Sequence, residues 1–192
     1  MVGWGNSKLS EDMYKEGYHN ITNMDISKVV IDKMKTRNEI WASMVWHQMD
    51  VTDMTYQNEW FDIVLDKSTI DTLLWGDKDI YMVAKMMREV QRVLKPGGRY
   101  VGISYGKPDN RTYHFKREHL DFELTQHKIT YTIYDKKSEE HEDNAHYIYV
   151  WSKGPNADTA ATRWARVEEN LISSINDSCK KKWWKTLFCI KQ

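Results

Sequence analysis

The sequence predicts an α/β fold with a mostly parallel sheet and helices on both of its faces. Short apolar runs alternate with amphipathic helical repeats over residues 1–104, which is typical of parallel sheets. The clearest strand, Phe61–Leu65, is almost continuously apolar, as expected of a strand covered on both faces. A helical repeat over 80–94 is stopped by Lys95–Gly98, because proline cannot continue a helix and the glycines allow a sharp turn.

The composition narrows the class of protein. The 192 residues include 28 basic and 28 acidic side chains, and 41% are hydrophobic. These proportions are typical of a globular chain, and the zero balance argues against a dedicated nucleic-acid-binding protein. The two cysteines, Cys179 and Cys189, form no CxxC motif, so neither a zinc ribbon nor a disulfide framework is expected. Without a membrane-length apolar run or a signal peptide, we expect a cytoplasmic protein.

In the first half of the chain, strands and helices follow one another closely. Helices are expected where apolar residues recur every three or four positions, and strands where apolar residues cluster. Ser27 is a suitable N-cap for the second helix, because its hydroxyl can accept a hydrogen bond in the first turn. The expected order is a strand end with a glycine turn over 1–7, a helix from Leu9 that Gly17 ends, a strand over 20–26, a helix carrying Val30, Ile31 and Met34, and strands over 44–49 and 61–65.

The pattern changes after Tyr105. Two longer strands joined by a charged connection predict an antiparallel hairpin at one edge of the sheet, and Gly154–Pro155 marks the end of the domain. We therefore divide the chain into a domain over 1–153 and a C-terminal part over 154–192. The remaining expected elements are strands over 99–104, 122–134 and 145–152, the connection 135–143, a helix with Trp164, Val167, Leu171, Ile172 and Ile175 capped by Asp158 or Thr159, and a basic aromatic tail, Lys180–Lys185.

Three features fall where ligands bind in such folds, outside the carboxyl ends of parallel strands. The Gly3–Gly5 turn lacks side chains that would keep a ligand from the backbone. Asp25 ends the next strand, where an acid typically accepts from ribose hydroxyls, and Asp50 ends the third, where it could accept from an adenine amino group. Singly, Asp25 could be a helix cap and Asp50 ordinary loop polarity. Together they favour a nucleoside site.

The glycine pattern limits the type of nucleoside. No Gly-Lys-Ser/Thr follows the turn, which excludes a Walker-type phosphate loop. The third glycine of the dinucleotide fingerprint is also absent. A nucleoside without a pyrophosphate is expected, and S-adenosylmethionine is the leading candidate.

Taken together, these residues resemble class I S-adenosylmethionine-dependent methyltransferases over residues 2 to about 152. More narrowly, Gly-x-Gly-Asn-Ser with Leu-Asp-Lys-x-Thr-x-Asp resembles the methyltransferase-like group that includes lysine methyltransferases of elongation factor 1A. The resemblance implies a Rossmann-like fold with strand order 3-2-1-4-5-7-6 and strand 7 antiparallel. The segments that carry it are Gly3–Ser7, Asp25–Ser27, Asp50–Val51, Leu65–Asp71 and Leu94–Gly98.

The resemblance also implies which residues meet the cofactor. S-adenosylmethionine would be bound, and S-adenosylhomocysteine would be the product. Asp66 would face the transfer site as the catalytic residue, and no metal is implied. The cofactor-binding residues would be Gly3, Gly5 and Asn6 at the methionine part, Asp25 and Ile26 at the ribose, Asp50 and Val51 at the adenine, and Lys67 beside the cofactor.

Three departures from the family pattern stand out. Trp4 replaces the small residue usual between the first two glycines, and Ser68 replaces the usual glycine of the Asp-Lys-Gly-Thr element. The body of the first strand and the aromatic segment that covers the cofactor in the family are absent, so we expect a shortened first strand. The missing N-terminal segment and Trp4 favour the alternative that the chain is a non-catalytic subunit that binds a partner through its tail and sheet edge. The presence of Asp25, Asp50, Asp66 and Lys67 favours a methyltransferase that acts on a protein lysine.

A lysine acceptor makes specific demands on the site. Its ammonium has a pKa of about 10.4 in water and must lose a proton before the nitrogen can attack. Asp66 would position the cation, with deprotonation through water, and Asp71 would either help or cap the next segment. Tyr105, Tyr113 and His114 would form either an aromatic wall for the acceptor or the packing of a loop. His141 and His146 are expected to lie in a solvated loop rather than in a metal site. The tail Lys180–Lys185 would either dock to a partner or pack over the open N-terminal surface.

Overall fold

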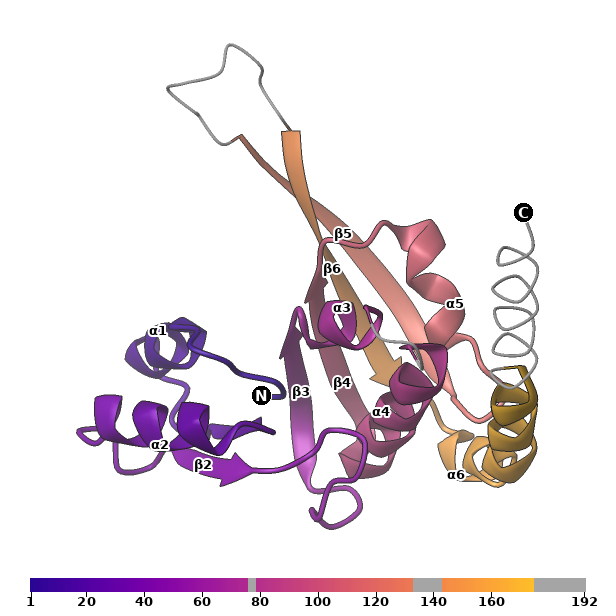
Figure 1. Ribbon diagram of the computed structural model, residues 1–192, viewed down its shortest axis with the longest axis horizontal. Coiled ribbons are helices and arrows are strands. Elements are labelled where there is room, and N and C mark those ends of the chain that lie inside the picture. Colours follow the sequence, from indigo (N-terminus) through magenta and orange to yellow (C-terminus); the bar gives the residue numbers. More distant parts are fainter. Residues whose placement is uncertain (76–78, 133–142, 175–192) are drawn as a thin grey trace, which may run out of the picture.

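The computed structural model describes residues 1–75, 79–132 and 143–174 and has an α/β architecture (Figure 1). A four-stranded sheet contains one parallel pair, β3 and β4, and its strand β6 runs antiparallel to both neighbours. A second sheet is a parallel pair, β1 and β2. In spatial order, the first sheet is β3 (Phe61–Lys67), β4 (Leu94–Ser104), β6 (Asp143–Lys153) and β5 (Phe122–Thr132), and the second is β1 (Thr22–Asp25) and β2 (Val45–Gln48).

Residues 1–4 lie between the two sheets and join them. The amide of Val2 donates to the Leu65 carbonyl of β3 at 2.9 Å. On the other side, the amide of Met24 in β1 donates to the Met1 carbonyl at 2.9 Å, and Trp4 donates back to Met24 at 3.2 Å. With this segment counted as a strand, the order is β2-β1-(1–4)-β3-β4-β6-β5, which is the order that the resemblance implies.

The main core lies on one face of the four-stranded sheet, beneath helix α4. Met86, Met87 and Val90 of α4 are fully buried against Val64 and Tyr100 of the sheet. Figure 1 shows the helices α3, α4 and α5 together beside this sheet, while α1 and α2 lie with β1 and β2. The helices of these two groups are α3 (Thr69–Leu73), α4 (Asp79–Val93), the 3-10 turn η1 (Pro108–Asn110) and α5 (Thr112–Phe115) on the first sheet, and α1 (Leu9–Lys15) and α2 (Lys28–Arg37) on the second.

The expectation that Phe61–Leu65 is covered on both faces is wrong. Val64 is buried under α4, but Ile63, which points to the opposite face, is 57% exposed. Val101 and Ile103 of β4 are only partly buried on that same face. An apolar composition therefore does not guarantee two covering layers, and this face of β3 and β4 remains open in the described part of the chain.

The junction between α4 and β4 differs slightly from the prediction. The helix ends at Val93 and the strand begins at the next residue, so Lys95–Gly98 lies inside β4 rather than in a separate loop. The pairing with β3 shifts there: Phe61 is opposite Leu94, whereas Ile63 is opposite Arg99. Gly97 has a φ of 72° and accommodates the bulge.

The C-terminal part contains two short helical segments rather than one capped helix. Asp158 and Thr159 lie inside α6 (Ala157–Ala161), which begins after Asn156, and a second helical segment covers 164–174. Trp164, Val167 and Leu171 pack against α4, as the sequence predicts. Ile172 is 44% exposed and does not belong to that face. Ile175, Cys179, Cys189, Lys180–Lys185, His141 and most of the connection 135–143 lie outside the described residues.

No helix in the described part of the chain is both long and apolar enough to span a membrane.

Candidate functional site

The predicted ligand-binding loops meet at one edge of the structure. Parallel pairing places the carboxyl ends of β1, β2, β3 and residues 1–4 on the same side. The loops that follow these ends carry all of the residues predicted to bind a nucleoside.

The turn at Gly3–Gly5 has backbone angles that suit glycine. Gly3 and Gly5 have φ values of 55° and 57°, in the left-handed region that most side chains disfavour. A Cβ on Gly3 would lie 2.2 Å from Oγ1 of Thr69, whereas a Cβ on Gly5 would meet nothing within 4 Å. Gly3 is therefore required for packing against α3, and Gly5 leaves open space where a ligand can approach the backbone.

Asp25 connects this turn to the end of β1. Its Oδ2 accepts a hydrogen bond from the Gly5 amide at 2.8 Å, and its Oδ1 accepts one from the Ser27 amide at 2.9 Å. The residue is 9% exposed. Because each carboxylate oxygen can accept two hydrogen bonds, the side chain keeps capacity for two more donors, the number that a ribose diol presents. Ile26 beside it is 69% exposed and offers an apolar surface.

Asp50 and Val51 follow β2 next to this position. The amide of Met49 donates to the Asp25 carbonyl at 3.0 Å, so the β2 loop starts directly beside Asp25. Asp50 accepts from the Thr52 amide through Oδ1 at 2.8 Å, which fixes its turn, and Val51 is buried. The structure thus brings Asp25 and Asp50 to neighbouring strand ends, as predicted.

The residues that end β3 complete the edge. Lys67 is exposed, and its charge lowers the pKa of His146 in addition to the effect of burial on that imidazole. Ser68 has a φ of 66° and a ψ of 12°, a left-handed conformation in the position where the family usually has glycine. Asn6 is exposed beyond the Gly3–Gly5 turn. Lys67 and Asn6 are therefore free to approach a ligand at this edge.

Asp66 is buried and does not face the surface where an acceptor was expected. Its carboxylate is fully buried and accepts hydrogen bonds from the amides of Thr69 and Ile70 at 2.7 and 3.1 Å and from the Tyr100 hydroxyl at 2.7 Å. Burial raises the pKa of Asp66, while these three donors act in the opposite direction. In this structure Asp66 anchors the start of α3 and so sets the position of Lys67 and Ser68.

Trp4 points away from this edge. It is 4% exposed and packs with Ile21, Ile31 and Trp46 in the core formed by α1, α2, β1 and β2. The indole therefore does not block the space beside Gly5. The departure from the family pattern at this position adds core volume between β1 and α2 without changing the predicted ligand edge.

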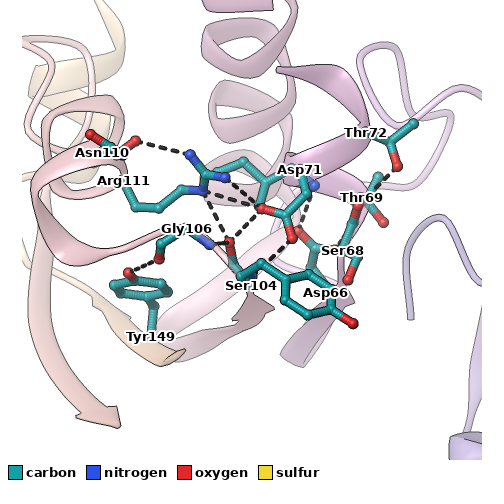
Figure 2. A network of polar contacts seen from close by, with 12 residues as sticks. Asp66, Ser68, Thr69, Asp71, Thr72, Ser104, Gly106, Asn110, Arg111 and Tyr149 are labelled. Carbon is teal, nitrogen blue, oxygen red and sulfur yellow. Dashed lines mark hydrogen bonds and ion pairs between the residues drawn. The ribbon is translucent and has the colours of Figure 1, made fainter. Parts of the chain in front are cut away.

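A polar network that the sequence did not reveal holds the loop after β4 (Figure 2). Arg111 donates to Oδ1 of Asp71 at 2.7 Å and to the Ser104 hydroxyl at 3.0 Å. Asp71 also accepts from the Ser104 hydroxyl and from the Tyr105 amide. Gly106 donates its amide to Ser104 at 2.9 Å. Asp71 is thus neither a helix cap nor exposed, because it is the buried centre of a clamp that joins α3 to the Tyr105 loop.

The clamp places an aromatic pair at the same edge. Tyr105, 60% exposed, lies 3.9 Å from the ring of His146, measured between ring centroids. Tyr113 is 48% exposed and packs on His114, which is buried. Tyr105 and His146 therefore present an aromatic surface near Lys67, whereas His114 has the loop-packing role. Within 1–75, 79–132 and 143–174, no three His, Cys, Asp or Glu residues are placed to hold a metal ion.

These features fit an adenosyl ligand. The edge offers an acidic side chain with spare acceptor capacity, a glycine turn with open space at Gly5, and an exposed apolar residue, Ile26, between them. By fold, the chain is a Rossmann-like α/β domain, and the residues at its carboxyl edge have the features expected of a nucleoside site.

Comparison with known proteins assigns the family. The family described as "Methyltransferase domain" matches residues 1–102, more than half of the sequence, and the chain therefore belongs to it. The cattle protein named "eEF1A lysine and N-terminal methyltransferase" is 44% identical over 124 residues, which cover 62% of this chain and 18% of that protein. The cattle protein named "EEF1A lysine methyltransferase 4" is 33% identical over 132 residues, 65% of this chain and 52% of its own length.

A solved structure supports the same fold. The N-methyltransferase NodS from Bradyrhizobium japonicum WM9, in complex with S-adenosyl-L-homocysteine, superposes with a TM-score of 0.56 at 14% identity, covering 80% of this chain and 76% of that one. At this identity the similarity concerns the fold alone. This chain spans only 18% and 52% of the length of the two cattle relatives.

Proposed function

We propose that this chain is an S-adenosylmethionine-dependent methyltransferase that transfers a methyl group to a lysine side chain of a protein. The observation that carries this proposal is the Asp25 carboxylate, which accepts from the Gly5 amide at 2.8 Å and retains acceptor capacity at the end of β1. Family membership and the names of the relatives, which refer to lysines of eEF1A, support both the cofactor and the acceptor class.

In this proposal the residues of the edge bind and orient. Asp25 would accept from the ribose hydroxyls, Ile26 and Val51 would contact the apolar faces of the nucleoside, and Asp50 would border the adenine. The bound cofactor supplies a methyl group that is activated by its sulfonium. For an in-line methyl transfer, the surrounding residues mainly have to orient the two reactants and exclude water from the site.

The acceptor side of the edge suits a lysine. A lysine ammonium has a pKa of about 10.4 in water, and a positive charge about 4 Å away disfavours that ammonium by roughly 4 kcal/mol at an effective dielectric constant of 20. The neutral amine is thereby favoured, and its proton can leave through water. Tyr105 and His146 offer an aromatic surface on which an alkylammonium can be held through cation–π contact. Asp66 acts here as a positioning residue beneath Lys67 and Ser68.

Two measurements test the proposal. Calorimetry should show binding of S-adenosylmethionine and of S-adenosylhomocysteine to the purified chain. Incubation with labelled S-adenosylmethionine and purified elongation factor 1A should then label lysine in the acid hydrolysate of the factor. Cofactor binding without a labelled protein, in a lysate as well as with the factor, would leave the non-catalytic alternative or a small-molecule acceptor. No heat at millimolar cofactor would contradict the enzyme function for this chain. With a protein acceptor of this kind, we also propose a cytoplasmic location.

A further inference from the structure

The connection between β2 and β3 carries Asp50, the acid that is expected to border the adenine. Residues 49–60 form this connection and contain no helix or strand (Figure 1). At its start, the amide of Met49 donates to the Asp25 carbonyl at 3.0 Å. The Asp50 carbonyl accepts from the Asp53 amide at 3.2 Å and so closes a turn. The turn is therefore fixed to β1 at its first end, and its other end must be held elsewhere.

Two side chains of α4 hold the other end of this turn, at Met54. The amide of Met54 donates to Oε2 of Glu89 at 2.8 Å, and its carbonyl accepts from Nη2 of Arg92 at 2.7 Å. Both backbone groups of Met54 are thus bound by a helix that lies 35 and 38 positions further along the chain. The turn cannot shift at this end unless these hydrogen bonds break.

Arg92 uses all five of its N–H donors in this arrangement. Its Nε and Nη2 donate to the two carboxylate oxygens of Glu89 at 2.9 and 2.7 Å, which makes a forked ion pair. Its Nη1 donates to the Tyr56 carbonyl at 2.7 Å and to the side-chain oxygen of Asn58 at 2.9 Å. Together with the bond to Met54, one planar guanidinium fixes three positions of the connection. A lysine, with three donors and no plane, could not make all of these bonds.

The position of Asp50 decides what kind of base the edge can accept. Its Oδ1 accepts from the Thr52 amide at 2.8 Å, and its carboxylate keeps further acceptor capacity. A carboxylate accepts a hydrogen bond from an amino group but repels a carbonyl oxygen. A site built around such an acceptor therefore rejects a base that lacks the amino group, provided that the acceptor is held in place.

We propose that Arg92, through Glu89 and Met54, positions Asp50 and thereby makes the nucleoside site selective for a purine with an amino group at C6 over one with a carbonyl there. This inference rests on the proposed function, because it assumes that an adenosyl ligand binds at this edge. Arg92 is a positioning residue, since all of its donors are used within the protein.

Two ligands that differ only at C6 of the purine test the proposal. S-adenosylhomocysteine carries the amino group, and S-inosylhomocysteine carries a carbonyl in its place. By calorimetry, the unmodified protein should prefer the adenosyl compound about tenfold or more. In Arg92→Ala this preference should fall to about twofold or less, and in Arg92→Lys to an intermediate value. A partly unfolded sample raises both dissociation constants by the same factor, so their ratio does not report stability.

Arg92→Lys keeps a cation beside Glu89 and provides the test if Arg92→Ala does not fold. Arg88→Ala is the matched control, one turn earlier on α4, where Arg88 is exposed beside Trp164, and it should keep the full preference. Hydrogen exchange followed by NMR without ligand gives a second readout. The Met54 amide should exchange at least about threefold faster in the Arg92 variants, whereas the Met49 amide should not change.

The outcomes separate this inference from the proposed function. Failure of the unmodified protein to bind either compound would contradict the proposed function and this inference with it. Binding of both compounds with equal affinity, or a preference that survives in both Arg92 variants, would overturn the role of Arg92 alone. A preference that is lost in Arg88→Ala as well would assign the effect to general loosening of α4 and would also overturn it.

Discussion

The carboxylate of Asp25 and the amide of Gly5 form a hydrogen bond of 2.8 Å that links the end of β1 to the glycine turn after residues 1–4. The same carboxylate accepts from Ser27, the N-cap of α2. One acidic side chain thus organises two of the loops that are predicted to hold the nucleoside. Its negative charge and its remaining lone pairs lie where both loops meet.

Replacing Asp25 with asparagine should weaken cofactor binding. The amide side chain keeps one acceptor oxygen but loses the charge and the second acceptor, and each hydrogen bond to a charged group contributes about 1.5–3 kcal/mol. We expect the dissociation constant for S-adenosylmethionine to rise about tenfold to a hundredfold, measured by calorimetry. Asp32→Asn on α2 removes an exposed acid that pairs with Lys28, and it should leave the affinity unchanged. Equal affinities of the two variants would contradict the role of Asp25.

The two glycines of the turn should differ in their tolerance of alanine. Both have a positive φ, so each substitution should cost about 1 kcal/mol of unfolding free energy. Gly3→Ala should cost about 1–3 kcal/mol more, because its Cβ would lie 2.2 Å from Oγ1 of Thr69. Urea denaturation measures both values, and Gly5→Ala is the matched control. The second substitution Thr69→Ala should recover part of the loss of Gly3→Ala, and no recovery would show that the Thr69 hydroxyl and methyl groups are not its cause.

Ser68→Gly should stabilise the protein. Ser68 has a φ of 66°, and a left-handed backbone costs a residue with a Cβ about 1 kcal/mol relative to glycine. We expect unfolding free energy to rise by about 1 kcal/mol in urea denaturation. Ser43→Gly is the control, since Ser43 is not among the residues with positive φ and glycine should lower stability there. A loss of stability in both variants would show that Ser68 contributes more through its hydroxyl than it costs through its backbone.

Part of the fold and of the site could be predicted from the sequence. The local sequence was sufficient to predict Ser27 as a helix N-cap, and its hydroxyl accepts a hydrogen bond from the Val30 amide in the first turn of α2. The strand ends that carry Asp25 and Asp50 were also placed correctly, because hydrophobic periodicity marks where strands stop. The glycine turn followed from its place after the first strand end, whereas the packing of Gly3 against Thr69 did not, and contact of the two glycines with a cofactor stays a prediction.

The remaining features depend on contacts between distant residues. Asp66 was expected to face an acceptor, but its carboxylate is held by the nearby amides of Thr69 and Ile70 and also accepts a hydrogen bond from the hydroxyl of Tyr100, 34 positions away. The ion pair of Asp71 with Arg111 joins residues 40 positions apart, and no local pattern indicates it. The exposure of Ile63 depends on which helices cover β3, which an apolar run alone does not specify. The assignment of domains to 1–153 and 154–192 remains a prediction.

The clamp around Asp71 should affect the acceptor step and not cofactor binding. Arg111→Ala leaves the Asp71 carboxylate, which is largely buried, without its cation and should release the loop that carries Tyr105. We expect turnover with a protein acceptor to fall about tenfold or more while the calorimetric affinity for S-adenosylmethionine stays within about twofold. Arg111→Lys restores a charge but not the forked geometry, and it should recover only part of the turnover. A matching loss of cofactor affinity would instead show general damage to the edge.

Acid should destabilise the fold through His119. This imidazole is fully buried against Trp164, and burial, together with the charges of Arg117 and Arg88, lowers its pKa from 6.5 to about 4. Because the folded-state pKa lies below the unfolded value, the stabilising contribution is complete above pH 6.5. It is lost as the pH falls from 6.5 to about 4, by about 3 kcal/mol in total.

The measurement is the urea midpoint and unfolding free energy as a function of pH from 7.5 to about 4. In the unmodified protein the unfolding free energy should fall as the pH falls, with a slope that corresponds to about one proton taken up by His119 on unfolding. The buried His114, whose pKa burial lowers to about 3, adds its own contribution to this slope. His119→Gln removes one titrating group and should flatten this slope, even if it lowers the stability at neutral pH. An equal slope in His119→Gln and the unmodified protein would mean that His119 is already accessible to protonation in the folded state.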